Sequence, residues 1–369
     1  MKGFQTMSRI IFTGGGSAGH VTLNLALIPI FLDKGWDVCY IGSYTGIERE
    51  LLEKFPKVKY YPIQTGKLRR YFSWQNFLDA LKIPVGILQA VRIVIKEKPD
   101  IIFSKGGFVS FPVVVAGFVR KVPVLMHESD VTPGLANKMS LRFVSKFFTT
   151  FEDTEKYVRD KEKVECIGPV MSNRFEGADK TRGFEFCRFT PEKPVLLFMG
   201  GSLGAKSLNH VVRRHIPTLL KKYQIIHLCG KGQEDPSYTA SGYKQFEYID
   251  KELKDLMAIS DVVISRAGSN AIFELLSLSK PMILVPLPTG SSRGEQMLNA
   301  KSFQAKGYAE IIPDEKLADD YLFLGTIDNV YENRDKYIEA MKNSGFKAIN
   351  NIDLAEKISD FAQKKSIDK

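Results

Sequence analysis

The sequence predicts an α/β protein with two domains, each a doubly wound parallel sheet covered by helices on both faces. Short β-branched or aromatic runs alternate with longer amphipathic stretches along the whole chain. The alternation starts again near residue 194, after a charged segment without clear periodicity. The length agrees, because 369 residues correspond to about two domains at roughly 150 residues each. Strands that alternate with helices are typical of parallel sheets.

The first half supplies one domain, at residues 1–170. A helix is expected at residues 21–34, because an amphipathic stretch there stops at Gly35, a residue suited to the left-handed cap that ends a helix. The strands are expected at residues 9–13, 37–41, 58–63, 100–104, 122–127 and 146–150.

The second half supplies another domain, at residues 194–345, after a linker at 171–193 and before a helical tail at 346–369. Two such domains leave a cleft between them, and ligands of these folds bind beyond the carboxyl ends of the strands. The strands are expected at residues 194–199, 224–229, 246–249, 261–265, 282–286 and 309–312.

Composition excludes several classes of protein. Hydrophobic residues make up 44% and charged residues 25% of the chain, which is ordinary for a globular protein. No window approaches 18 apolar residues and the N-terminus lacks a signal-peptide core, so we expect a cytoplasmic chain. The four cysteines are scattered, which favours reduced thiols over disulfides or zinc. The excess of 52 basic over 42 acidic residues suits partners that carry phosphate.

Four glycine-rich turns follow predicted strands, two in each domain. Backbone amides in such turns, together with the dipole of a following helix, can hold a phosphate. They lie at residues 14–20, 104–110, 200–205 and 265–270.

The sequence lacks the residues that define three common phosphate-binding sites. The first turn contains G-x-G-x-x-G, but the second strand ends in Cys39-Tyr40-Ile41-Gly42-Ser43 without the acid of a dinucleotide site. No turn has P-loop spacing. The chain has no Asp-x-Asp, so amides, hydroxyls and helix dipoles must offset the charge of a diphosphate.

Taken together, six segments resemble the MurG family of peptidoglycan N-acetylglucosaminyltransferases. Among them, residues 127–137 read His-Glu-Ser-Asp-Val-Thr-Pro-Gly-Leu-Ala-Asn and residues 293–300 read Arg-Gly-Glu-Gln-Met-Leu-Asn-Ala. The stretch after the first turn is similar to the Gram-positive branch. The segments follow the family order, at residues 14–20, 106–112, 127–137, 200–205, 265–274 and 293–300.

The resemblance implies the GT-B fold, two Rossmann-like domains with an interdomain cleft. It implies an inverting transfer of N-acetylglucosamine from UDP-N-acetylglucosamine to lipid I, undecaprenyl-diphospho-N-acetylmuramoyl-pentapeptide, which gives lipid II. We expect no cofactor and, without an Asp-x-Asp pair, no metal site. The enzyme would act at the inner face of the cell membrane as a peripheral protein, alongside other cell-wall synthesis proteins.

The resemblance also assigns roles to residues of this chain. His20 is the expected general base or acceptor-side hydrogen-bonding partner. Glu274 matches the ribose-binding acid, whose carboxylate can accept from both hydroxyls of a diol, while Asn299 is expected to be structural. Gly106, Gly107 and Ser110 are expected at the acceptor. The residues expected at the donor are Ser17, Ala18, Gly19, Asp130, Ser202, Ile249, Ser269, Asn270, Ala271, Ile272, Phe273, Glu274 and Gln296.

Two positions depart from the family pattern. Asp130 stands where the family often has Asn, and an ionised Asp accepts hydrogen bonds but cannot donate them. Met171 replaces the arginine of the family's Asn-Pro-Val-Arg, and either Arg174 or Arg266 could supply the missing charge.

Other readings stay open. Residues 67–74 mix cations with aromatics and residues 77–94 are mostly apolar, which suits an anionic membrane surface or a core-packed helix equally. A GT-B transferase with another lipid acceptor, a UDP-sugar epimerase and a non-catalytic scaffold are the alternatives. No nucleic-acid-binding module is visible.

Overall fold

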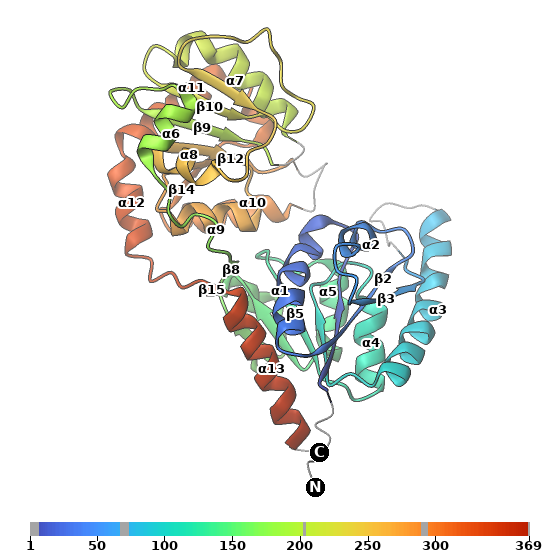
Figure 1. The fold of residues 1–369 in the computed structure, drawn as a ribbon. Helices are drawn as coiled ribbons and strands as arrows, with labels where there is room; N and C mark the ends of the chain where they lie inside the picture. The colour runs from blue at the N-terminus through green and yellow to red at the C-terminus, as the bar shows by residue number, and fades with distance from the viewer. Residues whose placement is uncertain (1–6, 67–73, 202–203, 289–293, 368–369) are drawn as a thin grey trace. The chain divides into compact units, whose positions relative to one another are not determined.

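The computed structural model describes residues 7–66, 74–201, 204–288 and 294–367 (Figure 1). The chain divides into two compact units. Unit 1 comprises residues 1–170 and 348–369, and unit 2 comprises residues 171–347.

Unit 1 contains a seven-stranded sheet in the order β3-β2-β1-β4-β5-β6-β7, with every neighbouring pair parallel. The strand order reverses direction between β1 and β4, and the loops that follow these strands lie at the carboxyl edge where ligands bind in such sheets. The strands are β1 (Arg9–Thr13), β2 (Asp37–Ser43), β3 (Lys59–Ile63), β4 (Ile101–Ser104), β5 (Val124–Glu128), β6 (Lys146–Thr149) and β7 (Val164–Cys166).

Helices cover both faces of this sheet because successive strand residues point to opposite sides. Ile10 and Phe12 pack with α1 and α13, whereas Ile11 packs with α3 and α4. Gly35, at φ 77°, ends α1 as predicted. The helices are α1 (Thr22–Asp33), α2 (Ile47–Leu52), α3 (Trp74–Glu97), α4 (Phe111–Val119), α5 (Leu135–Ser140) and α13 (Asn351–Ile367), with 3-10 turns η1 (Ala18–His20), η2 (Leu141–Phe143), η3 (Glu152–Tyr157) and η4 (Lys161–Lys163).

Unit 2 repeats the plan with six parallel strands in the order β11-β10-β9-β12-β13-β14. Phe323 of α11 contacts Phe198 of β9 and His215 of α7, which anchors these helices to the sheet. The strands are β9 (Val195–Met199), β10 (Gln224–Leu228), β11 (Tyr243–Phe246), β12 (Val262–Ser265), β13 (Met282–Leu284) and β14 (Ala309–Ile311). The helices are α6 (Lys180–Cys187), α7 (Lys206–Leu219), α8 (Leu253–Ile259), α9 (Ser269–Ser277), α10 (Glu295–Ala305), α11 (Asp320–Glu332) and α12 (Arg334–Lys342), with η5 (Asp314–Lys316).

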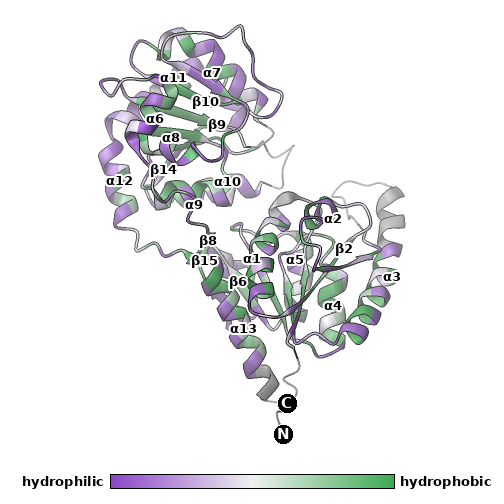
Figure 2. Ribbon diagram, viewed as in Figure 1, coloured by the Kyte–Doolittle hydropathy of each residue, from purple (hydrophilic) through white to green (hydrophobic). Residues whose placement is uncertain are grey.

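Hydropathy follows this layering, with apolar residues concentrated on the strands inside both units (Figure 2). The central strands β1, β4, β5, β9 and β12 are buried along almost their whole length. Continuous apolar strands of this kind are typical of parallel sheets covered on both faces. No helix among the described residues is long and apolar enough to cross a bilayer.

The segments expected as linker and tail contain ordered helices. Helix α6 lies within residues 171–193 and contacts α8, and Arg182 pairs with Asp255 at 2.9 Å. Helix α13 lies within residues 346–369 and buries Leu354 and Ile358 in the core of unit 1. Strand β11 starts at Tyr243, three residues before its expected start at residue 246. Two short strands, β8 (Val170–Met171) and β15 (Ile349–Asn350), form a separate sheet where the chain passes between the units.

Candidate functional site

The first glycine turn follows β1 and leads into η1 and α1. Gly16 lies at φ 83°, in the left-handed region that favours glycine. A Cβ at Gly16 would lie 2.3 Å from the ring of Phe108, so a larger residue would clash with the turn after β4. Ser17 Oγ lies 2.9 Å from His20 Nδ1. When Nδ1 donates to this hydroxyl, Nε2 is the ring nitrogen that can accept a proton, which suits His20 as a base.

The turns after β1 and β4 are in direct contact. Gly107 lies at φ 84°, and a Cβ there would lie 2.2 Å from the carbonyl oxygen of Gly15 and 3.1 Å from His20 Nδ1. The structure therefore brings His20 and Gly107 together. Ser110 is fully buried and donates from Oγ to the carbonyl of Gly107 at 2.8 Å, so its hydroxyl braces the turn.

A buried carboxylate that the sequence did not single out lies beneath the first turn. Glu48 is fully buried and accepts from the amides of Ser43, at 2.9 Å, and Gly16, at 3.3 Å. An amide that donates to a carboxylate cannot also donate to a phosphate, and the negative charge disfavours one nearby. This geometry opposes a dinucleotide site at the turn. No motif marks Glu48, because its burial depends on how α2 packs.

A buried lysine joins the strand ends of β4 and β5. Lys105 Nζ lies 2.7 Å from His127 Nδ1 and donates to Ser129 Oγ at 3.0 Å. Only 4% of Lys105 and 2% of His127 are exposed. Burial lowers the pKa of Lys105 to about 8, although the negative charges of Glu128 and Asp130 oppose the shift. Burial, and then the charge of Lys105, hold the pKa of His127 well below its usual value, so His127 is neutral.

Glu128 organises the loop that carries Asp130. Its carboxylate accepts from the amides of Ser129, at 3.0 Å, and Asp130, at 3.2 Å, and from the side chain of Asn137 at 2.9 Å. A Cβ at Gly106 would lie 2.3 Å from Asn137 Oδ1. The loops after β4 and β5 are therefore tightly packed against each other.

In unit 2, the third glycine turn follows β9 and precedes α7. Gly201 lies at φ 89°, and a Cβ there would have no described atom within 4 Å. Gly204, at φ 75°, lies against the carbonyl of Cys229 and leaves no room for a side chain. Ser202 lies outside the described residues.

Helix α9 carries the largest group of expected donor residues. Asn270 is exposed and Ala271 half-buried, whereas Ser269, Ile272 and Phe273 are buried. The Phe273 ring meets the rings of Phe303 and Phe346 in the core. Ile272 and Phe273 can therefore offer a ligand only backbone groups, and the same holds for Ile249, which is 7% exposed.

Glu274 lies on α9 and forms an ion pair with Arg174. Burial raises the pKa of the Glu274 carboxyl, and the nearby guanidinium of Arg174 opposes this shift. The Arg174 side chain is 42% exposed. A carboxylate in such an ion pair keeps lone pairs that can accept hydrogen bonds from the two hydroxyls of a vicinal diol.

Arg266 has a different environment. It pairs with Asp314, and donates to the carbonyl of Val285 at 3.1 Å and to Ser207 Oγ at 3.0 Å. Ser207 Oγ in turn donates to Asp314 Oδ1 at 2.7 Å. The Arg266 side chain is 12% exposed. Arg266 therefore ties together the segments after β12, β13 and β14 and the start of α7.

The remaining candidates lie on α10. Gln296 is half-buried and accepts at Oε1 from the amide of Leu287 at 3.2 Å. Asn299 is fully buried and donates to the carbonyl of Ala267 at 3.2 Å, which links α10 to the turn after β12. Within the described ranges, no group of three or more His, Cys, Asp or Glu residues could hold a metal ion.

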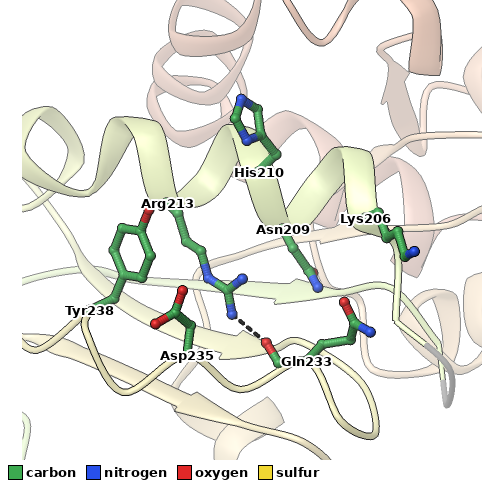
Figure 3. Close-up of a pocket in the computed structure, with 7 residues that line it drawn as sticks. All are labelled: Lys206, Asn209, His210, Arg213, Gln233, Asp235 and Tyr238. Carbon is green, nitrogen blue, oxygen red and sulfur yellow. Dashed lines mark hydrogen bonds between the residues drawn. The ribbon is translucent and has the colours of Figure 1, made fainter.

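A polar pocket of about 290 Å³ lies between α7 and the loop after β10 (Figure 3). Arg213 donates to the carbonyl of Gln233, and Asp235 accepts from Ser237 Oγ at 2.6 Å. These bonds engage Arg213 Nη2 and the Asp235 carboxylate, whereas Arg213 Nε is buried with no hydrogen-bond partner among the described residues. No expected site residue lines the pocket, which is formed by Lys206, Asn209, His210, Arg213, Gln233, Asp235 and Tyr238.

Comparison with known proteins identifies the family of both domains. Residues 10–149 match the glycosyltransferase family 28 N-terminal domain, and residues 195–358 match the family's C-terminal domain. The crystal structure of Acinetobacter baumannii MurG superposes with a TM-score of 0.75 at 22% identity, covering 97% of this chain and 99% of that one. The predicted fold class, two doubly wound parallel-sheet domains of the GT-B type, is confirmed.

Two relatives are much closer in sequence. Both are named UDP-N-acetylglucosamine--N-acetylmuramyl-(pentapeptide) pyrophosphoryl-undecaprenol N-acetylglucosamine transferase, the second with the number 2. The one from Geobacillus thermodenitrificans is 50% identical over 338 residues, 91% of this chain and 94% of the relative. The one from Bacillus cereus is 51% identical over 348 residues, 94% of this chain and 98% of the relative. With both domains matched and about half of its residues shared with these relatives, the chain belongs to the MurG family within glycosyltransferase family 28.

Proposed function

We propose that this chain transfers N-acetylglucosamine from UDP-N-acetylglucosamine to lipid I and so makes lipid II. The observation that carries the proposal is the identity of about one half, over more than 90% of the chain, with relatives named for this transfer. Such similarity extends over most of both units.

The expected residues fit an inverting displacement. His20 accepts the proton of the acceptor hydroxyl, the oxygen attacks the anomeric carbon, and UDP leaves with the bonding electrons. Ser17 orients the His20 ring through the 2.9 Å contact at Nδ1. Gly106 and Gly107 receive the acceptor diphosphate.

The donor is held mainly by the turns and helices that follow β9, β11, β12 and β13. Glu274 binds the ribose diol, and backbone groups near Ile249 and along residues 269–273 read the uracil edge. Ser202, with the turn after β9, binds the diphosphate, and Gln296 binds sugar hydroxyls. Ser17, Ala18, Gly19 and Asp130 are the donor contacts that unit 1 contributes.

Arg174, rather than Arg266, is the cation available to the donor. Arg266 is enclosed by Asp314, Ser207 and Val285 and is 12% exposed, whereas Arg174 is 42% exposed and already pairs with Glu274. A donor that engages Glu274 therefore meets Arg174 as well.

The enzyme works as a peripheral protein on the cytoplasmic face of an anionic membrane. An exposed apolar stripe on α3 supports this, because residues at helical spacing share one face. Its side chains are 47–61% exposed and belong to Leu81, Val85, Leu88 and Ile95. The basic and aromatic residues at 67–73 lie outside the described residues.

The test of the reaction is transfer of labelled N-acetylglucosamine from UDP-N-acetylglucosamine to a short-chain lipid I analogue, with and without EDTA. Labelled product under both conditions supports the transfer and a diphosphate site that needs no metal. Product only without EDTA keeps the transfer but assigns a divalent cation to the diphosphate. UDP binding without product under either condition contradicts the proposed acceptor.

A further inference from the structure

Lys105 is a buried cation to which neither the family resemblance nor the proposed reaction gives a role. It immediately precedes Gly106 and Gly107, and its backbone amide donates to the carbonyl of Thr13 at 2.9 Å. The residue is thus fixed between the ends of β1 and β4, directly beneath the turn expected to receive the acceptor diphosphate.

The hydrogen bonds of Lys105 determine the state of its neighbour. Because the ammonium only donates, the 2.7 Å contact makes His127 Nδ1 the acceptor and places the proton of the neutral ring on Nε2. His127 therefore adds no positive charge at this edge of the sheet. The second bond, to Ser129 at 3.0 Å, joins the turn after β4 to the loop after β5.

Two carboxylates face the same region. Glu128 is buried and accepts from neutral amide donors, which belong to Ser129, Asp130, Gly134 and Asn137. Asp130 is half-buried on the next loop. Both charges act on Lys105, and both would repel a diphosphate placed at Gly106 and Gly107.

We propose that Lys105 is a positioning residue for the acceptor, whose buried charge offsets Glu128 and Asp130 so that a diphosphate can bind at Gly106 and Gly107. This inference rests on the proposed function. A diphosphate beside Lys105 favours its protonated form, so acceptor binding is linked to the proton on Nζ. The titratable and charged groups around this site are Glu128 and Asp130, the neutral His127, and, across the turn, His20 and the buried Glu48.

The test is steady-state transfer with the short-chain lipid I analogue, measured from pH 6.5 to 9.5 for wild type, Lys105→Gln and Lys105→Arg. We expect Lys105→Gln to raise the KM for the acceptor about tenfold, with kcat and the KM for UDP-N-acetylglucosamine nearly unchanged. The wild-type acceptor KM should rise as pH passes about 8, where the ammonium is lost, and Lys105→Gln should lack this rise. Lys105→Arg keeps the charge and should restore part of the affinity.

Lys54→Gln is the matched control, because Lys54 is exposed in the same unit and its loss removes an equal charge. If Lys105→Gln lowers kcat and raises both KM values by similar factors, with no change in pH profile, Lys105 has only a structural role and the inference is overturned. An unchanged acceptor KM would also overturn it. If wild type makes no product in the same assay, the proposed function fails first, so the two failures are distinguishable.

Discussion

Arg174 and Glu274, one hundred positions apart in the chain, form an ion pair in unit 2. Burial raises the pKa of the Glu274 carboxyl while Arg174 opposes the shift. The ion pair therefore limits the rise in pKa of a half-buried carboxylate at the position expected to bind ribose.

Affinity for UDP should depend on the ionisation of Glu274. The ionised carboxylate accepts from the ribose hydroxyls, so binding is strongest above the raised pKa and weakens as pH falls through it. We expect Glu274→Ala to weaken UDP binding by about 1.5–3 kcal/mol, measured by calorimetry. Glu339→Ala, which removes an exposed glutamate of α12, should leave the dissociation constant unchanged.

Arg174→Gln should move this pH dependence. The variant removes the guanidinium that lowers the pKa of Glu274, so the loss of UDP affinity should begin at a higher pH than in wild type. The difference in UDP binding free energy between wild type and Glu274→Gln at each pH cancels the contribution from the titration of UDP itself. A midpoint that stays in place, or moves to lower pH, would show that Arg174 does not act through Glu274.

His20→Ala should retain UDP binding and lose most turnover. A positioned base contributes about 10²–10⁴-fold to a rate, and the main donor residues lie in unit 2. Ser17→Ala should give a smaller loss at saturating donor, because it removes the 2.9 Å contact that orients the ring but leaves the base in place. Single-turnover rates at saturating donor provide the measurement, and unchanged rates in His20→Ala would remove this residue from catalysis.

Gly107→Ala should damage both stability and transfer. The new Cβ would lie 2.2 Å from the carbonyl oxygen of Gly15, at a backbone φ of 84°. Gly345→Ala is the control, since Gly345 has a comparable φ of 63° but open space around it. We expect Gly345→Ala to cost about 1 kcal/mol in the free energy of unfolding with transfer unchanged. Similar unfolding energies for the two variants would argue against the contact.

Arg266→Gln should lower the free energy of unfolding by about 3 kcal/mol. The substitution leaves the carboxylate of Asp314, whose side chain is 16% exposed, without its cation. Arg214→Gln breaks an ion pair with Asp320, which is 57% exposed, and should cost under about 1 kcal/mol. Urea unfolding of both variants makes the comparison, and equal costs would contradict a structural role for Arg266.

Much of the fold could be predicted because strands and helices are marked by local sequence patterns. The buried strand from Arg9 to Thr13 is a short apolar run before a glycine turn, and its observed bounds equal the predicted ones. The C-terminal helix shows the limit of this reasoning. The apolar stripe that carries Leu354 and Ile358 indicates a helix with a buried face, but periodicity does not say which sheet that face covers.

For the candidate site as well, some features follow from local sequence and others depend on tertiary packing. The positions of His20 and Gly107 on turns after strands follow from the sequence, because parallel strands end at one edge. The burial of Glu48 and Lys105 does not, because it depends on packing between segments far apart in the chain. Arg174 and Arg266 likewise could be distinguished only by their partners, Glu274 and Asp314.

The packing of α13 on unit 1 determines the order in which the units can be completed during synthesis. Leu354, Ile358 and Ala362 share a hydrophobic cluster with Leu27 and Phe31 of α1, so the face of α1 stays exposed on the ribosome until Ala362 has been made. Unit 2, at residues 171–347, has by then been synthesised in full. The unit that begins first is thus the last to close its core, which reverses the usual N-terminal-first order of domain folding.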